Sequence, residues 1–165
     1  MTSTMTIRRA TARDAKRLTR LVRASSAYEG PYAPMIAGYR VGPDYIETHQ
    51  VFLAVDPGNR VLGFYALVLD PPELDLLFVA DDLQGCGIGR LLVAHMTDRA
   101  RAAGVDGVRV VSHPPAEGFY RSVGARYTGT DAAHPPAVMW DRPEFVLPTG
   151  PVGSTALTPP AAQPA

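Results

Sequence analysis

A glycine-rich run between an apolar strand and a helix constrains the fold of this chain more than any other feature. Residues 73–79 carry the alternation that is typical of a strand. Residues 84–90 follow with the sequence Gln-Gly-Cys-Gly-Ile-Gly-Arg, and helical spacing of apolar side chains begins at Ile88. Such a turn leaves backbone N–H groups unpaired at the positive end of a helix dipole, and glycines let an anion approach closely. The run therefore predicts a phosphate or pyrophosphate site.

The spacing of the glycines distinguishes three kinds of phosphate-binding loop. A Rossmann fingerprint requires Gly-x-Gly-x-x-Gly, but the position three residues after Gly87 is Arg90. A Walker loop requires Gly-Lys followed by Ser or Thr, and the sequence contains no such tripeptide. Gln84, Gly87 and Gly89 fit the pattern Gln-x-x-Gly-x-Gly instead. This pattern resembles the acyl-CoA pyrophosphate motif of the GNAT acetyltransferase superfamily.

A second segment carries the same resemblance. Residues 116–125 read Ala-Glu-Gly-Phe-Tyr-Arg-Ser-Val-Gly-Ala, which is similar to the Ala-x-x-Phe-Tyr helix and following glycine of the family. The strand at 76–79 and the helix start at 88–92 also resemble the family pattern. The resemblance implies an α/β (α+β) acyltransferase fold, with a mixed, mostly antiparallel sheet of about six or seven strands and about four flanking helices. It also implies that the central strands splay apart.

By position, the resemblance implies where acetyl-CoA, the expected co-substrate, would bind. The backbone groups that hold its pantetheine correspond to Leu77, Phe78 and Val79. The amides implied in pyrophosphate binding follow Gln84 and are those of Gly85, Cys86, Gly87, Ile88, Gly89 and Arg90. His113 stands where the family often has Asn, which leaves open whether it donates the same hydrogen bond or takes part in proton transfer. No metal is expected, because the other histidines lack ligand spacing.

The resemblance also implies catalytic roles. Tyr120 matches the tyrosine that protonates the departing CoA thiolate. Glu73, which begins the strand eleven residues before Gln84, matches the general base of some members. Asp75 is the reserve candidate for the base, and the alternative is that both carboxylates are solvated or bind the substrate amine. Cys86 stands at a variable loop position of the family, which disfavours a role as nucleophile.

The acceptor is expected to be a primary amine of a small molecule, such as a metabolite, an amino acid derivative or an antibiotic. Four tyrosines lie in residues 26–47, where the family places the helices that cover the acceptor site. They either line a pocket for a small substrate or pack this segment onto the body of the domain. An amine of a peptide or protein is the alternative acceptor. The alternative to an enzyme is a module that binds acyl-CoA without turnover.

Composition excludes several other classes. The chain has 165 residues with 16 basic and 16 acidic side chains, so a cationic nucleic-acid binder is not expected. One cysteine excludes a disulfide framework, and no apolar run is long enough for a membrane helix. The N-terminus lacks the pattern of a secretory signal, so we expect a cytoplasmic protein. Fifteen of the basic residues are arginine, which suggests a GC-rich bacterial genome. A homodimer is left open, since similar proteins are often dimers.

One domain is expected over residues 1–147, followed by an uncharged, disordered Pro/Ala-rich tail at 148–165. Thr11 and Asp14 predict a capping box before the first helix. Alternation predicts Leu74, Leu76 and Phe78 on one strand face. Further elements are expected as a strand at 6–9, a short helix at 34–39, a hairpin at 51–69, and final strands at 126–130 and 137–140.

Overall fold

A computed structural model of the chain describes residues 4–28 and 30–150. Within these ranges the chain forms a seven-stranded sheet in the order β1-β2-β3-β4-β5-β7-β6, in which only β4 and β5 pair in parallel. The strands are β1 (Thr6–Arg9), β2 (Gln50–Val55), β3 (Val61–Leu69), β4 (Pro72–Val79), β5 (Gly107–Val111), β6 (Arg126–Asp131) and β7 (Arg142–Pro148). The expected mixed, mostly antiparallel sheet is therefore confirmed.

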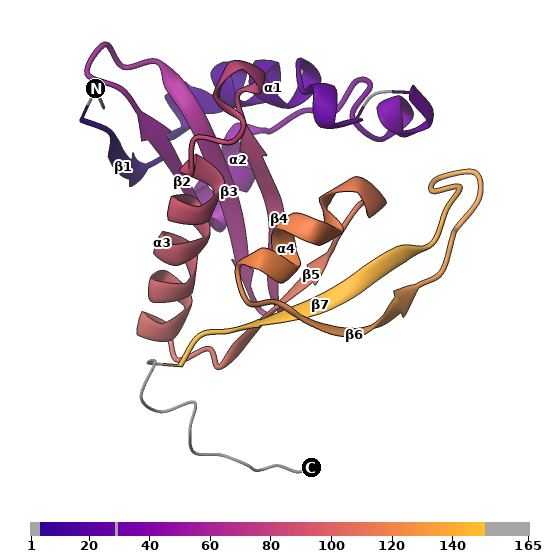
Figure 1. Ribbon diagram of the computed structural model, residues 1–165. Helices are drawn as coiled ribbons and strands as arrows, with labels where there is room; N and C mark the ends of the chain where they lie inside the picture. Colours follow the sequence, from indigo (N-terminus) through magenta and orange to yellow (C-terminus); the bar gives the residue numbers. More distant parts are fainter. Residues whose placement is uncertain (1–3, 29, 151–165) are drawn as a thin grey trace.

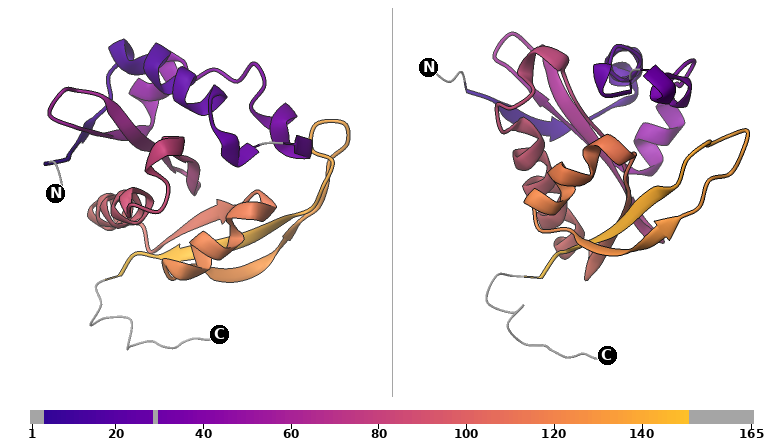
Figure 2. Two further views of the ribbon diagram at one scale, coloured as in Figure 1. Left: turned by 45° about the horizontal axis from the view of Figure 1, so that its top comes forward. Right: turned by 45° about the vertical axis from the view of Figure 1, so that its right-hand side comes forward.

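Helices cover both faces of this sheet (Figures 1 and 2). The α-helices within the described ranges are α1 (Ala15–Arg23), α2 (Pro43–Thr48), α3 (Ile88–Ala102) and α4 (Glu117–Ser122). Side chains of α3 and α4 join one buried apolar cluster, and side chains of α1 and α2 join another on the opposite face. No helix in the described part of the chain is long and apolar enough to cross a membrane.

The two parallel strands at the centre of the sheet meet at one end only. Along the described lengths of β4 and β5, the single paired position is Glu73 opposite Arg109. Beyond this pair the strands diverge, as Figure 1 shows. The splay expected between central strands is thus confirmed, and it opens the sheet where a ligand can enter.

A β-bulge interrupts β4 close to this splay. Ala66 of β3 pairs with Leu76, but the next residue, Leu67, pairs with Leu74. Asp75 is therefore an extra residue with no partner on β3. A bulge re-aims the side chains around it and is frequent beside functional sites.

The bulge also corrects the expected faces of β4. Leu74 packs in the same cluster as Leu77 and Val79, whereas Leu76 and Phe78 pack in the cluster of α1 and α2. The expectation that Leu74, Leu76 and Phe78 share a face is wrong, because one extra residue reverses the alternation beyond it. A strand that reads as regular in sequence thus supplies apolar side chains to both cores.

Three expected elements differ in the structure. The expected strand at 137–140 is wrong: these residues lie in the β6–β7 loop, where Val138 forms an isolated bridge with His134. Residues 30–35 form a 3₁₀ helix in place of the short helix expected at 34–39, and α2 was not expected after Gly42. The last strand is β7. Thr149 follows it, is buried, and donates from its amide to the carbonyl oxygen of Asp106 at 3.1 Å. Most of the expected tail, residues 151–165, lies outside the described residues.

The expected capping box is present and buried. Asp14 is 3% exposed and accepts hydrogen bonds from the Thr11 amide at 2.9 Å and from Arg8 and Arg17. Burial by itself raises the pKa of Asp14, but the hydrogen bonds from Arg8, Thr11 and Arg17 outweigh it and hold the pKa well below its usual range. The carboxylate thereby ties β1 to the start of α1.

We expect Asp14→Asn to lower the free energy of unfolding by about 2 kcal/mol at neutral pH, because charged hydrogen bonds are lost in a buried place. A group with a lowered folded-state pKa stabilises the protein above its unfolded-state pKa of about 4 and loses that contribution as the pH falls. Urea unfolding of both proteins checks this. A difference that stays the same at about pH 3 would contradict the assignment.

Candidate active site

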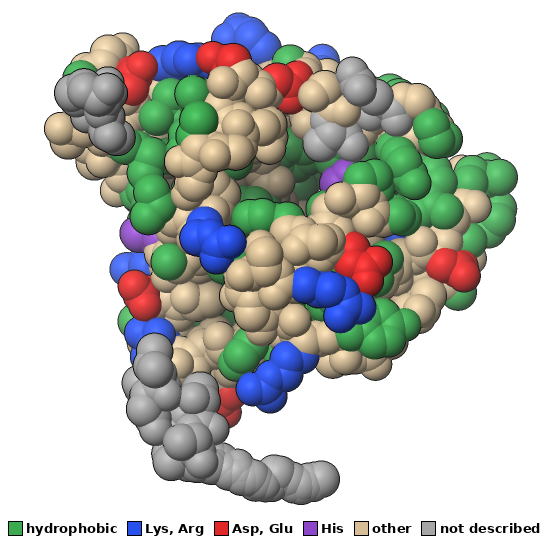
Figure 3. Space-filling model, in the orientation of Figure 1, with side chains coloured by type: hydrophobic (Ala, Val, Ile, Leu, Met, Phe, Trp, Pro, Cys, Tyr) green, Lys and Arg blue, Asp and Glu red, His purple; other side chains and the backbone are tan. Residues whose placement is uncertain are grey.

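The splay of β4 and β5 holds a cleft of about 660 Å³, here called the β4–β5 cleft. Figure 3 shows the molecule hollowed between its two halves, with apolar side chains around the hollow. Eleven of the residues expected at the site line this cleft, namely Leu77, Phe78, Val79, Gln84, Gly85, Gly87, Ile88, Gly89, Arg90, His113 and Tyr120. Cys86 and Glu73 were also expected there but do not line it.

The glycines of the loop serve two different purposes. Gly85 and Gly87 have φ angles of 80° and 86°, and a Cβ atom built on either meets nothing within 4 Å. Their backbone is therefore open to the cleft in a conformation that favours glycine. A Cβ atom on Gly89 would instead lie 3.3 Å from the Phe119 ring, so this glycine lets α3 pack closely against α4.

The loop leads into the N-terminus of α3, which has 15 residues. Gly87 is its N-cap and provides no side-chain cap. Gln84 fixes the loop to β4 by donating from Nε2 to the carbonyl oxygen of Val79 at 3.0 Å. Unpaired amides, a helix dipole and glycines without Cβ atoms thus face the β4–β5 cleft together. This arrangement fits the phosphate groups of a nucleotide-like ligand.

Arg90 is not free to act as a simple phosphate ligand. Its guanidinium donates to the carbonyl oxygen of Ser122 at 3.2 Å and lies 3.4 Å from the Ser122 hydroxyl oxygen. These bonds join α3 to the end of α4. The side chain therefore positions α4 as well as adding positive charge at the rim of the cleft.

Tyr120 enters the β4–β5 cleft from α4. Tyr120 is 9% exposed, and its ring packs against Phe119 and Phe145. Within the described residues its hydroxyl has no hydrogen-bond partner. Burial raises the pKa of Tyr120 above its usual range, with a further contribution from Tyr28. The side chain thus offers a protonated hydroxyl to whatever occupies the cleft.

His113 belongs to an aromatic wall. The Tyr28 ring stacks on its imidazole with 4.1 Å between centroids and 15° between planes. Tyr32 meets His113 edge-on at 6.0 Å and Trp140 edge-on at 4.7 Å. Tyr32 thereby joins the 3₁₀ helix at 30–35 to the β6–β7 loop, and Figure 2 shows these two segments side by side. Burial raises the pKa of Tyr28 to about 12, although Arg142 opposes the rise.

Asp75, the bulged residue of β4, lines the β4–β5 cleft. The Tyr45 hydroxyl of α2 donates a hydrogen bond to its Oδ2. Burial and this bond raise the pKa of Tyr45 well above its usual range. Tyr39 also lies near, since burial and then the charge of Asp75 raise its pKa. The bulge therefore presents one carboxylate to the cleft with tyrosines beside it.

Glu73 occupies a different environment. Arg109 donates from Nη1 to its Oε1 at 3.3 Å and also binds Glu144, with 3.0 Å between Nε and Oε2. Burial raises the pKa of Glu73, and the nearby Arg109 opposes the rise. The pair lies where β4 and β5 meet, at the closed end of the splay. The structure thus brings Asp75, and not Glu73, to the cleft.

Sequence reasoning missed the role of several residues around the cleft. Trp140 was expected in a strand but contributes to the aromatic wall, and Ser25 and Ser26 line the cleft from the end of α1. No local signal marks them, because their position depends on chain segments far away in sequence. Among residues 4–28 and 30–150, no group of three His, Cys, Asp or Glu side chains is placed to hold a metal ion.

Comparison with known proteins agrees with this geometry. A family model described as "Acetyltransferase (GNAT) domain" matches residues 39–133, more than half of the chain. Over 79 residues the chain is 33% identical to the peptidyl-lysine N-acetyltransferase YjaB of Escherichia coli, covering 48% of this chain and 51% of YjaB. Its match to YjaB of Salmonella typhimurium is 28% identical over 105 residues, covering 64% and 66%. The chain thus spans about half the length of the first of these relatives.

Solved structures share the fold. The GCN5-related N-acetyltransferase from Rhodopseudomonas palustris has a TM-score of 0.76 at 17% identity, with 90% of this chain and 98% of that chain covered. The solution structure of apo YjaB from Escherichia coli has a TM-score of 0.65 at 22% identity, covering 87% and 97%. Fold, cleft and family match lead to one conclusion. The chain belongs to the GNAT acetyltransferase family.

Proposed function

We propose that the protein is an acetyl-CoA-dependent N-acetyltransferase that uses the β4–β5 cleft. One observation carries this proposal: the strand splay, the open glycine loop at the start of α3 and the hydroxyl of the buried Tyr120 all border the same cleft. A packing role alone would explain Gly89, but it does not explain the open backbone at Gly85 and Gly87. The cleft instead has the features of a site for an acyl carrier with phosphate groups.

Acetyl-CoA supplies the acetyl group as a thioester. The amides of Gly85 and of residues 87–90 would bind its pyrophosphate, because unpaired N–H groups at a helix start favour anions. The Cys86 amide, which the resemblance included, donates instead to the carbonyl oxygen of Leu83 at 3.3 Å. The backbone of Leu77, Phe78 and Val79 would hold the pantetheine along the edge of β4 that the splay leaves unpaired. A β4 N–H would donate to the thioester carbonyl oxygen, where negative charge develops during transfer.

Two side chains would move protons. An alkylamine has a pKa near 10.4 and is mostly protonated at neutral pH, so it must lose a proton before its nitrogen attacks. Asp75 is placed to accept that proton at the free carboxylate oxygen. As the new C–N bond forms and the C–S bond breaks, Tyr120 would donate its proton to the departing thiolate sulfur. The new amide nitrogen must also lose a second proton, which would pass through solvent to the Tyr120 phenolate. Asp75 would release its proton to solvent, so that both groups return to their starting states.

We further propose that the acceptor is a lysine side chain of a polypeptide. The names of the two relatives support this class over the small-molecule amine that the sequence favoured. The Asp75 carboxylate and its neighbouring tyrosines suit a long alkylammonium, which has an apolar stem and a charged end. A small-molecule amine acceptor remains the rival, and the same assay tests it.

The test is release of CoA thiol from acetyl-CoA in the presence of pooled acceptors. The pools are lysine-containing peptides, free amino acids, polyamines, aminoglycosides and arylamines. We expect release with the peptide pool and a mass increase of one acetyl group on a lysine. Release only with a small-molecule pool would overturn the peptide acceptor. No release from any pool, by protein that acetyl-CoA stabilises against heat, would favour a binding module without turnover.

The loop itself can be tested with Gly87→Ala. Alanine at a φ of 86° is strained by about 1–2 kcal/mol, and its methyl group enters the space open to the phosphates. We expect the Kd for acetyl-CoA to rise about tenfold or more, as measured by calorimetry.

Gly104→Ala is the matched control at the opposite end of α3, where φ is 80° and the space is also open. It should destabilise the protein by a similar amount without changing the Kd for acetyl-CoA. Equal losses of affinity in both variants would mean that helix stability, and not phosphate contact, explains the effect.

A further inference from the structure

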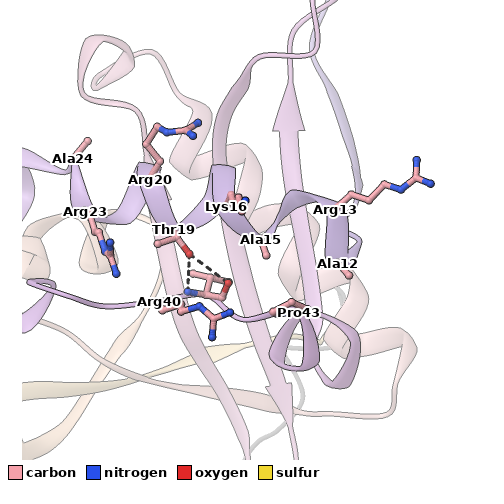
Figure 4. Close-up of a pocket in the computed structure, with 11 residues that line it drawn as sticks. Ala12, Arg13, Ala15, Lys16, Thr19, Arg20, Arg23, Ala24, Arg40 and Pro43 are labelled. Atoms are coloured by element: carbon pink, nitrogen blue, oxygen red, sulfur yellow. Dashed lines mark hydrogen bonds between the residues drawn. The ribbon is translucent and has the colours of Figure 1, made fainter.

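A second hollow lies outside the β4–β5 cleft, between α1 and residues 40–43. It is a groove of about 840 Å³, here called the α1 groove. Figure 4 shows its two sides. Lys16, Arg20 and Arg23 come from α1, Arg13 comes from the 3₁₀ turn before it, and Arg40 comes from the facing loop. None of its eleven lining residues is acidic.

The cations of the α1 groove are exposed and mostly unpaired. Arg23 donates to the carbonyl oxygens of Tyr39 and Gly38, which holds its guanidinium against the chain. The other four basic residues make no hydrogen bond or ion pair within the part of the chain that the structure describes. By contrast, Arg17 on the same helix pairs with Asp14 at 2.7 Å. One side of α1 therefore keeps its positive charge available.

The floor of the α1 groove is apolar and held in place. Ala15 and Val41 are buried, and Val41 is 1% exposed. The Thr19 hydroxyl accepts a hydrogen bond from the Val41 amide at 2.9 Å and lies 3.3 Å from the Val41 carbonyl oxygen. Figure 4 shows both bonds crossing the groove. The groove is thus preformed, with apolar surface below and positive charge along its rim.

We propose that the α1 groove binds an acidic segment of a polypeptide. Lys16 and Arg23 lie at the two ends of α1, seven residues and about 10 Å apart along the helix, which matches about three residues of extended chain. Arg13, in the 3₁₀ turn that precedes α1, extends this row. A single small anion would meet only part of this row. An apolar floor suits the hydrophobic side chains of a peptide better than a sugar-phosphate backbone. Residues 151–165 of this chain carry no charged side chain, so they lack the complementary charge.

The groove also leads toward the β4–β5 cleft. Ala24 lines the groove, and the next residues, Ser25 and Ser26, line the cleft. A polypeptide that lies along α1 can therefore present a nearby amine at the cleft. This part of the inference rests on the proposed function, and it predicts acceptor lysines that have acidic residues close to them in the sequence.

The binding test uses fluorescence anisotropy without acetyl-CoA. The probe is a labelled peptide with acidic residues around one leucine and a lysine at its end; the comparison peptide carries Gln and Asn instead. We expect the acidic peptide to bind, and the double charge reversal Arg20→Glu with Arg40→Glu to raise its Kd about tenfold or more. The matched control is Arg126→Glu on β6, an exposed arginine outside the groove, which should change the Kd less than about twofold. Circular dichroism melting confirms that each variant is folded.

Several results would overturn the proposal. Equal binding of the acidic and neutral peptides would do so, as would loss of binding in the Arg126 variant alone. Tighter binding of a single-stranded oligonucleotide than of the acidic peptide would assign the groove to nucleic acid. Dimers in sedimentation that only the double variant disrupts, without peptide binding, would assign it to a second copy of the chain.

The prediction that acceptor lysines have acidic residues close to them is tested separately, by acetylation kinetics. With wild-type protein, we expect kcat/KM for a lysine flanked by acidic residues to exceed that for a neutral flank by about tenfold, mainly through KM. No acetylation of either peptide, together with binding of the acidic one, would contradict the proposed function and leave the groove assignment supported. Equal acetylation of both peptides would overturn the link between groove and acceptor.

Discussion

Tyr120→Phe is expected to lower kcat by about 100-fold or more while leaving the Kd for acetyl-CoA nearly unchanged. The substitution removes only the hydroxyl, which faces the β4–β5 cleft without a protein partner in the described structure. The ring contacts with Phe119 and Phe145 are retained, so little stability should be lost. Because burial raises the pKa of Tyr120, its hydroxyl stays protonated to high pH. Deprotonation of Tyr120 should therefore not lower kcat at any pH up to about 10.

Tyr65→Phe is the matched control for this experiment. Tyr65 is also buried, and burial likewise raises its pKa. It lies away from the cleft, with its hydroxyl bonded to Nδ1 of His95 at 2.8 Å. Its loss should cost about 1 kcal/mol of stability without changing kcat. An unchanged kcat in the Tyr120 variant would remove this hydroxyl from the mechanism.

Asp75→Asn is expected to lower kcat by about 100-fold at neutral pH, because the amide cannot take a proton from the acceptor amine. The substitution keeps the size of the side chain and can still accept the hydrogen bond from Tyr45. Steady-state kinetics at saturating acetyl-CoA measure the effect. A primary amine supplied at a pH above its own pKa needs no base, so the deficit should shrink as the pH rises toward about 10.

Glu73→Gln separates the two carboxylates. It removes one charge from a partly exposed network with Arg109 and Glu144, so we expect less than about 1 kcal/mol of destabilisation and a much smaller loss of kcat. A larger loss of kcat in the Glu73 variant than in the Asp75 variant would contradict the assignment of Asp75 as the general base. It would favour Glu73, the base that the sequence resemblance implied.

Features encoded within a few neighbouring residues could be predicted from the sequence. Gln84, Gly87 and Gly89 define the loop by their spacing, and the structure places all three at the cleft. The resemblance of residues 116–125 to the family's Phe-Tyr helix implied a role for Tyr120, which also lines the cleft. The loop depends on turn geometry and on the start of a helix, which a short window of sequence specifies.

Features that depend on register or on distant contacts could not be predicted in this way. Nothing in residues 72–79 marks Asp75 as an extra residue, because the bulge is defined only by pairing with β3. Its partner Tyr45 is 30 residues away on α2, a helix that was not expected from the sequence, although Pro43 stands in its first turn, where proline is favourable. The apolar residues at 137–140 satisfy a strand pattern, yet they lie in the β6–β7 loop that meets Tyr32.

The central claim is that acetyl-CoA binds in the β4–β5 cleft with its phosphates at the start of α3. The most direct measurement is a titration of ¹⁵N-labelled protein with acetyl-CoA, followed by amide chemical shifts. We predict that the largest shifts fall on residues 77–79 and 85–90, with little change along Arg13–Arg23. Shifts that instead gather along α1, or that leave residues 85–90 unchanged at saturation, would contradict the account.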